Sequence, residues 1–324
     1  MGIDRQHGGG TMAEVDFRGV TCGLCGVEES TRTGEHVVPR WLLRRLFPPA
    51  EPGQAGYTIE RNGDPVISRG KVRTTSEASH FRMPMCRLCN DRLSERFENG
   101  ATKDAVEKLL CEGDDRALQR EDVHLASLWL IKTTMLMAHP ATVNTDEHWT
   151  SVPDAWPLDH PELWVWMTNG GEPPDGISLW IARFSRLDTS GSLDRSIGRI
   201  QLPEIRFEGG DTVKFLENAA GLADTGYAVV YHPGWQIDHP HEAAGMAVRL
   251  WPNPPTSLDF NRLAELEGQA AADFQSLFQR QVGLFIDGDL LEPGADPLRI
   301  GWEKELAIRG GSFVVPRLRG MYAR

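Results

Sequence analysis

Two Cys-x-x-Cys pairs, Cys22/Cys25 and Cys86/Cys89, lie in the first third of the sequence. Four thiolates in two such knuckles are the ligand set of a tetrahedral structural zinc site, which is closed by protein ligands. Sixty residues separate Cys25 from Cys86, far more than in a simple zinc ribbon. We therefore predict one structural Zn²⁺ that joins two knuckles with a structural unit between them. The alternative is four unrelated buried cysteines.

Three further residues near these pairs carry groups that suit phosphodiester hydrolysis. Glu35 and His36 are adjacent between the pairs, and Asn90 follows the last cysteine. A neutral histidine can take a proton from water near pH 7. A hard cation held by a carboxylate and a carboxamide oxygen can stabilise the charge that develops on a phosphate. The alternative is that Glu35 caps the following helix and His36 is a satisfied core histidine.

These motifs together resemble the zinc-stapled HNH endonucleases. The matching residues are Cys22-x-x-Cys25, Glu35-His36-Val37-Val38-Pro39 and Cys86-x-x-Cys89-Asn90, within residues 20–100. The resemblance implies a ββα metal finger, with His36 as general base and Glu35 and Asn90 as ligands of a catalytic Mg²⁺ or other divalent cation. Many members have Asp at the position of Glu35 and His at that of Asn90. The middle residue of the family pattern has two candidates by position, His80 and Asn62.

Arginines surround the predicted site. Arg40 and Arg44 lie one turn apart on the helix expected after Pro39, with Arg45 beside them, and Arg87 lies in the second knuckle. Guanidinium groups suit phosphates, so we predict that these four bind nucleic acid. The alternative is a solvated helix face.

Two acidic residues, Asp91 and Glu98, follow Asn90 on its helix. We interpret both as solvated surface, with a contribution to the metal site as the alternative.

The charge is unevenly distributed along the chain. The net charge is −12, yet residues 1–110 hold 16 Lys/Arg against 15 Asp/Glu, and residues 40–96 hold 11 against 6. A locally basic window on an acidic chain predicts a phosphate-binding face on the finger rather than over the whole surface. The alternative is a chance fluctuation.

Length and composition indicate a protein of two domains. The chain has 324 residues, is 40% hydrophobic and shows neither a basic-then-apolar leader nor a membrane span. We expect a cytoplasmic protein without membrane contact. Residues 1–13 are predicted to be a disordered leader, 14–112 the zinc finger nuclease domain, and 113–324 an acidic accessory domain of unassigned role.

The predicted fold class is α+β, with the finger followed by a mixed α/β domain that contains an antiparallel sheet. In the finger we expect strands at 15–20 and 81–85, a short helix after Pro39 and a helix over 89–98. In the second domain we expect helices at 124–139 and 258–278. Strands are expected there at 177–184, 197–207, 227–232, 247–251 and 312–315. We interpret residues 238–242, Asp-His-Pro-His-Glu, as a surface loop.

The sequence thus predicts a metal-dependent endonuclease that hydrolyses nucleic-acid phosphodiesters, with DNA as the expected substrate. A role in phage defence is suggested by analogy alone. The alternatives are a non-catalytic zinc module that binds nucleic acid or protein, and a finger that serves small-molecule phosphate or other metal chemistry. The acidic domain is expected to mediate homo-oligomerisation or to bind a protein partner.

Overall fold

The computed structural model describes residues 15–46, 81–111, 113, 116–144, 160–185 and 236–274. It also describes shorter stretches at 199–201, 204–207, 212–222, 224–232, 284–287, 298–300, 307–309 and 312–315. His80, Asn62 and the predicted leader lie outside these residues.

The N-terminal part is a small antiparallel sheet followed by a helix. β1 (Glu35–His36) pairs with β2 (Phe81–Met83), which pairs with β4 (Val143–Asn144), and α2 (Arg87–Phe97) follows β2. α1 (Arg40–Leu46) follows β1 directly after Pro39, as predicted. α2 confirms the helix expected over 89–98, with its start two residues earlier.

The strand predicted at 15–20 is wrong, because this segment forms a turn. The amide of Phe17 donates to the carbonyl of Arg32 at 2.9 Å, and the Phe17 side chain is buried. The first pairing is an isolated bridge between Thr21 and Glu29. The buried ring and the backbone hydrogen bond of Phe17 therefore hold residues 15–20 in place without a strand.

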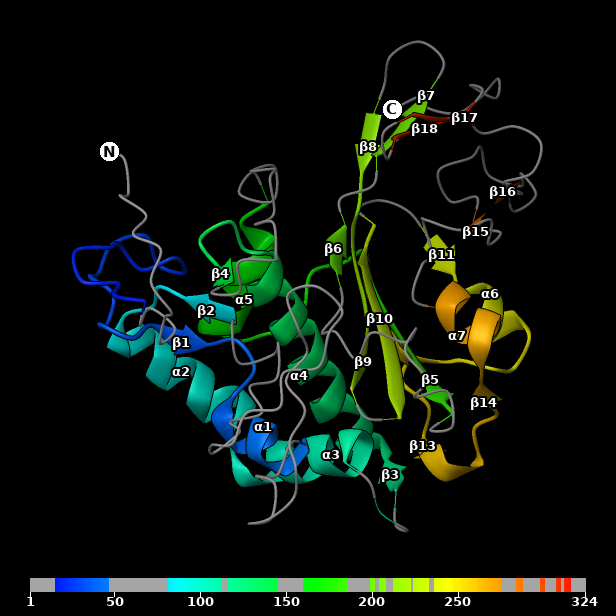
Figure 1. Ribbon diagram of the computed structural model, residues 1–324, viewed down its shortest axis with the longest axis horizontal. Coiled ribbons are helices and arrows are strands. Elements are labelled where there is room, and N and C mark those ends of the chain that lie inside the picture. The colour runs from blue at the N-terminus through cyan, green and yellow to red at the C-terminus, as the bar shows by residue number, and fades with distance from the viewer. Residues whose placement is uncertain are drawn as a thin grey trace, which may run out of the picture.

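Two helices connect the small sheet to the rest of the chain. α3 (Gly100–Leu110) begins at Asn99, whose side chain accepts a hydrogen bond from the amide of Thr102 at 3.0 Å. α4 (Arg120–Ala138) confirms the helix predicted at 124–139, with its start four residues and its end one residue earlier, and it begins with a capping box between Gln119 and Asp122. From Ala126 onward α4 is buried on all sides, because it lies between the small sheet and the large one (Figure 1).

Within the described residues, the larger sheet is mainly antiparallel and has six strands. Its order is β12 (Val248–Trp251), β5 (Ile177–Phe184), β10 (Thr225–Tyr231), β9 (Leu216–Leu222) and β6 (Arg199–Gln201). The sixth strand, β14 (Glu265–Leu266), pairs with β5 in parallel. β5, β9 and β10 are buried almost throughout, because α4 lies on one side and α6 (Pro240–Ala243) and α7 (Gly268–Phe274) lie on the other (Figure 1).

Several short elements complete the structure. They are β3 (Ala117–Gln119), paired with β13 (Ser257–Asp259); α5 (Glu162–Asn169); β11 (Gln236–Asp238), β15 (Leu284–Asp287) and β16 (Leu298–Ile300); and β7 (Glu204–Phe207), β8 (Thr212–Lys214), β17 (Ala307–Arg309) and β18 (Ser312–Val315). The five strands predicted for this part of the chain all correspond to observed strands, and that at 197–207 is two strands, β6 and β7.

The helix predicted over 258–278 is wrong for residues 258–267. Residues 257–259 form β13, residues 260–262 a 3-10 helix and residues 265–266 the strand β14, and within the described residues of this span the α-helix is α7 at 268–274. Backbone pairing with β3 and β5 has overridden the helical spacing of the leucines, as tertiary context often does.

One hydrophobic cluster in the described residues crosses the predicted domain boundary. It includes Met83 and Phe97 before the predicted boundary at residue 112, and Trp129 and Leu179 after it. A mixture of helices with antiparallel sheets confirms the α+β class. None of the helices in the described part of the chain is long and apolar enough to cross a membrane.

Candidate metal centre and adjoining site

The four predicted thiol ligands come together. The Sγ atoms of Cys22, Cys25, Cys86 and Cys89 all lie within 4.8 Å of one another, and those of Cys25 and Cys86 are 3.9 Å apart. Ligands about 2.3 Å from a tetrahedral zinc ion lie about 3.8 Å from one another, whereas a disulfide would bring two sulfurs to about 2 Å. The cluster therefore has the donor set and the spacing to hold a metal ion such as zinc.

Each knuckle is shaped by local hydrogen bonds. In the first, the amide of Cys22 donates to the carbonyl of Glu28 at 2.8 Å, and the amide of Gly26 donates back to the carbonyl of Cys22 at 2.9 Å. In the second, Cys86 is the N-cap of α2, and its Sγ accepts a hydrogen bond from the amide of Cys89 at 3.4 Å. The helix start therefore helps to place two of the four sulfurs.

Backbone hydrogen bonds also join the two knuckles, which are far apart in sequence. The amide of Gly23 donates to the carbonyl of Pro84 at 2.9 Å, and the amide of Thr31 donates to that of Met85 at 2.9 Å. The segment just before the second knuckle thus lies along the first. The cysteine cluster and these backbone bonds therefore join the same two segments of the chain.

The thiols differ in their electrostatic surroundings. Burial raises the pKa of Cys22 and of Cys89. Burial alone would also raise the pKa of Cys25, but hydrogen bonds from the amides of Glu28 and Val27 outweigh it and lower the pKa to about 7. The fifth cysteine, Cys111, is buried in the core, and burial raises its pKa to about 11.

Glu35 and His36 form β1, which pairs with β2, the strand that precedes the second knuckle. Glu35 lies opposite Met83, and His36 lies opposite Arg82. Gly34 precedes them with a φ of +58°, and a Cβ atom there would collide with the carbonyl oxygen of Met83 and the ring of Phe17. Only glycine fits this turn, which sets the direction in which the Glu-His pair enters the ladder.

The imidazole of His36 is held by the next helix. Nε of Arg40, in the first turn of α1, donates a hydrogen bond to Nε2 of His36 at 2.9 Å. Because a guanidinium can only donate, this bond requires a lone pair on Nε2. The structure therefore brings together one predicted phosphate-binding arginine and the predicted general base.

Glu35 is half-buried and lies among several charged groups. Burial raises its pKa to about 7, while the charges of Lys132, Arg82 and Arg40 oppose the rise and that of Glu98 adds to it. Nζ of Lys132, on α4, is 3.7 Å from Oε1 of Glu98, at the end of α2. The solvated-surface interpretation of Glu98 is wrong, since its side chain is only 15% exposed and faces a buried lysine.

Lys132 is the residue whose role the sequence did not reveal. Its only signal was a single charged residue in an otherwise apolar stretch of α4.

Asn90 lies on α2 within the second knuckle and is half-buried. Its backbone amide donates a hydrogen bond to the carbonyl of Cys86 at 3.1 Å. Within the described residues, the four cysteines form the only group of three or more His, Cys, Asp or Glu side chains placed to share a metal ion.

The other predicted arginines have different surroundings. Nε of Arg45 is 4.0 Å from a carboxylate oxygen of Glu107 on α3. The side chain of Arg87 is 90% exposed, and its Nε is 3.7 Å from Oδ2 of Asp91, one turn away on α2. Arg44 belongs to α1, and its side chain lies outside the described part of the structure.

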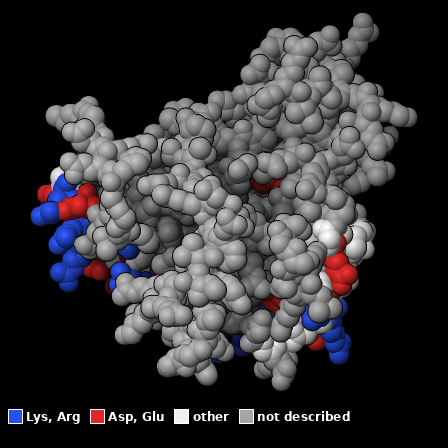
Figure 2. Space-filling view, in the orientation of Figure 1, with Lys and Arg blue, Asp and Glu red and all other residues white. Residues whose placement is uncertain are grey.

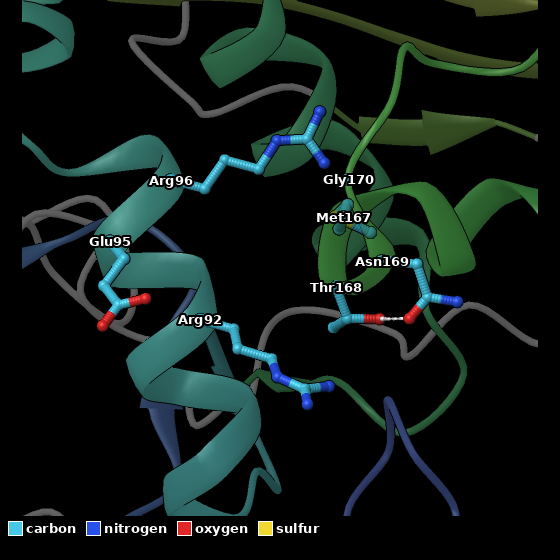
Figure 3. Close-up of a pocket in the computed structure, with 7 residues that line it drawn as sticks. All are labelled: Arg92, Glu95, Arg96, Met167, Thr168, Asn169 and Gly170. Atoms are coloured by element: carbon cyan, nitrogen blue, oxygen red, sulfur yellow. Dashed lines mark hydrogen bonds between the residues drawn. The ribbon is translucent and has the colours of Figure 1, made fainter.

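A cleft of about 550 Å³ adjoins α2 on the side of α5. Figure 3 shows Arg92 and Arg96 extending from α2 toward the end of α5, whereas Glu95 points away. Arg96 donates to the carbonyls of Trp166 and Gly171, so it caps the C-terminal end of α5 and holds the two helices together. The guanidinium of Arg92 is exposed at the mouth of this cleft.

The surface charge of the described residues is mixed in the view of Figure 2. Basic side chains at the left edge, over the N-terminal segment and α2, lie beside acidic ones. Ion pairs of the described residues agree with this mixture, since Arg18 pairs with Asp16 and Arg87 lies beside Asp91.

In the C-terminal part, the surface-loop interpretation of residues 238–242 is wrong, since Asp238 ends β11, residues 240–242 belong to α6 and His239 between them is buried. His239 is fully buried between Trp180 and Phe274, with ring centroids 5.5 Å and 4.7 Å away. Glu242 accepts hydrogen bonds from the indole of Trp180 and the guanidinium of Arg249. This cluster packs α6 and α7 onto the large sheet.

Comparison with known proteins adds no further assignment, since no family model, no curated protein and no solved structure matches the chain.

Proposed function

We propose that this protein is a metal-dependent nuclease of the HNH type, which hydrolyses phosphodiester bonds of nucleic acid, with DNA as the expected substrate. The observation that carries the proposal is the order of elements around the Glu-His pair. A two-strand ladder bearing Glu35 and His36 leads through the Cys86 knuckle into α2, which carries Asn90. The resemblance in sequence motifs implies the same arrangement.

The cysteine cluster serves as the scaffold in this proposal. Zinc bound by the four thiolates would be closed to water and to substrate, so it would be structural. It ties the segment before β1 to the start of α2. Glu35 and Asn90 would hold a second, divalent cation, which supplies charge stabilisation to the phosphate under attack.

His36 acts as the general base. Its Nε2 takes a proton from the attacking water, whose oxygen forms a new bond to phosphorus. The phosphorus–oxygen bond to the leaving sugar breaks, and the leaving oxygen takes a proton from solvent. Because Nε2 accepts a hydrogen bond from Arg40, the guanidinium must move before the base can act. A bound phosphate would draw the guanidinium away from His36, because a phosphate pairs with arginine more strongly than a neutral imidazole does.

The second candidate is a binding module that has a zinc scaffold without cleavage activity. The bond between Arg40 and His36 favours it, because a base whose lone pair stays occupied cannot accept a proton. In that case Arg40, Arg87 and Arg92 contribute charge to a nucleic-acid contact and no phosphodiester bond is broken.

Supercoiled plasmid separates the two candidates. The purified full chain, incubated with Mg²⁺ or Mn²⁺, should convert it to nicked or linear DNA. Addition of EDTA should stop the reaction, and zinc content should be measured before and after. DNA binding without metal-dependent cleavage, under any of these cations, would favour the binding module and overturn the nuclease.

A further inference from the structure

One of the four cysteines in the cluster differs from the others in its exposure. Cys25 is exposed, whereas the other three are buried, at 3% or less. Residues 25–29 are exposed throughout, and the side chain of Val27 among them is 79% exposed. A Cβ atom added at Gly26 would meet no heavy atom within 4 Å. The turn that carries Cys25 is therefore open to small solutes.

This exposure matters because a metal-bound sulfur keeps its own reactivity. A zinc ion with four protein ligands has no open position, but the sulfur of a ligand can still react with a molecule that reaches it. The thiolate is the reactive form of cysteine, and metal binding holds a cysteine as the thiolate. Hydroperoxides oxidise thiolates that are accessible to them. Of the four ligands, Cys25 is the one that such an oxidant meets first.

A second sulfur lies close to Cys25. Its Sγ atom is 3.9 Å from that of Cys86, which belongs to the other knuckle. Because a disulfide requires about 2 Å between its sulfurs, the two atoms need to approach by about 2 Å. The backbone hydrogen bond from the amide of Gly23 to the carbonyl of Pro84 joins the two knuckles independently of any metal. Cys86 therefore stays near Cys25 when the metal leaves.

We propose that Cys25 is an oxidation site, at which hydrogen peroxide converts the zinc-bound cluster into a zinc-free cluster with a disulfide between Cys25 and Cys86. The thiolate of Cys25 attacks one peroxide oxygen and the oxygen–oxygen bond breaks, which with one proton from solvent gives a sulfenic acid and water. The thiolate of Cys86 then attacks the sulfenic sulfur. The hydroxyl group leaves with a second proton as water, so two electrons have passed from the two sulfurs to the peroxide.

The two remaining thiols do not hold the metal. Only Cys22 and Cys89 of the cluster are then available, whereas structural zinc takes four ligands, so the ion leaves as Zn²⁺. A dithiol reductant reverses the change, because exchange breaks the disulfide and returns both thiolates. The zinc content of the chain thus depends on the balance of peroxide and thiols. This inference requires the zinc site but not the proposed nuclease activity.

The first test uses the full chain loaded with zinc. It is treated with substoichiometric hydrogen peroxide, released zinc is followed with a metal indicator, and the remaining thiols are alkylated under denaturing conditions before peptide mass mapping. We expect zinc release to keep pace with the disulfide between Cys25 and Cys86, and dithiothreitol with added zinc to restore the metal. First oxidation at Cys111, or a first disulfide between Cys22 and Cys25, would overturn the assignment.

Two histidine variants test the role of exposure. Cys25→His keeps a four-ligand set, since three cysteines and one histidine form a common structural zinc site, but it removes the exposed thiolate. Its zinc release by peroxide should be slower than the parent's by about tenfold or more. Cys89→His is the matched control, because it makes the same exchange at a buried ligand and keeps both Cys25 and Cys86. It should release zinc at close to the parent's rate.

Equal release rates in the two variants would show that exposure does not select the reacting thiol, and the proposal would be overturned. A parent that binds no zinc, or that keeps its zinc under peroxide, overturns it as well. If either variant fails to bind zinc, the peptide map of the parent decides alone. None of these measurements uses DNA, so a chain that binds zinc without cleaving DNA contradicts the proposed function and leaves this test intact.

Discussion

Nε of Arg40 donates a hydrogen bond to Nε2 of His36 at 2.9 Å, across one turn at the start of α1. The bond joins a group suited to phosphate with a group suited to accepting a proton. In the proposed mechanism the two are released from each other when substrate arrives, so Arg40 should affect substrate binding more than the chemical step.

The first prediction concerns this arginine. Arg40→Gln should raise the KM for DNA more than it lowers kcat, because it removes a phosphate contact and leaves Nε2 of His36 accessible. The slope of log affinity against log salt should become shallower by about one unit. Arg262→Gln, an equal loss of charge at an 87% exposed site far along the chain, is the control. Equal salt slopes in the two variants would contradict the role of Arg40.

The second prediction concerns the cluster of four cysteines. Cys86→Ser should lose most of the bound zinc and unfold at lower temperature, because folding and zinc binding are coupled. Serine is a favourable N-cap, so the substitution keeps the cap of α2 and isolates the loss of the sulfur ligand. Cys111→Ser removes a buried thiol outside the cluster and should keep its zinc. The idea fails if freshly purified, unchelated parent protein contains no zinc by elemental analysis.

The third prediction concerns the turn before the Glu-His pair. Gly34→Ala should destabilise the protein by about 3 kcal/mol, since it adds a steric collision with Met83 and Phe17 to an unfavourable backbone conformation. Gly19 has a similar φ of +74° with open space around it, so Gly19→Ala should cost about 1 kcal/mol. Chemical denaturation measures both. Equal losses would mean that the turn tolerates a side chain.

The fourth prediction concerns pH. Burial lowers the pKa of His239 from about 6.5 to about 3, with the charges of His241 and Arg249 adding to the effect. The folded state thus binds fewer protons than the unfolded state between these values, and stability falls as pH decreases from 6.5. One such group changes the free energy of unfolding by at most about 1.4 kcal/mol per pH unit.

His239→Asn should reduce this dependence. Asparagine keeps an acceptor for the amide of His241, which donates to Nδ1 of His239 at 3.1 Å, but it does not titrate. Unfolding free energies at pH 7.5 and pH 5.5 should therefore differ less in the variant than in the parent. An identical pH slope in both proteins would show that His239 does not couple to stability in this range.

Sequence reasoning was sufficient where local chemistry decides the structure. The two Cys-x-x-Cys pairs predicted that four thiols meet at one centre, and in the structure their Sγ atoms lie within 4.8 Å of one another. The long helix at 120–138 was predictable from its apolar run, and β5 from its length and content. In each case the segment has one way to satisfy its backbone and bury its side chains.

The sequence was insufficient where distant segments decide. The leucines after residue 257 have helical spacing, yet β13 pairs with β3 and β14 with β5. The contact between Lys132 and Glu98 joins two helices and has no local signature. The bond between Arg40 and His36 depended on the rotation of α1 relative to β1, which spacing alone does not give.

The central claim is that His36 is the base of a phosphodiester hydrolysis, and single-turnover cleavage by His36→Ala tests it most directly. The variant should keep its zinc, its fold and its DNA binding, but cleave about a hundredfold more slowly or worse. Added imidazole should restore part of the rate, since it replaces the missing base. A zinc-loaded His36→Ala protein that cleaves DNA as fast as the parent would contradict the claim.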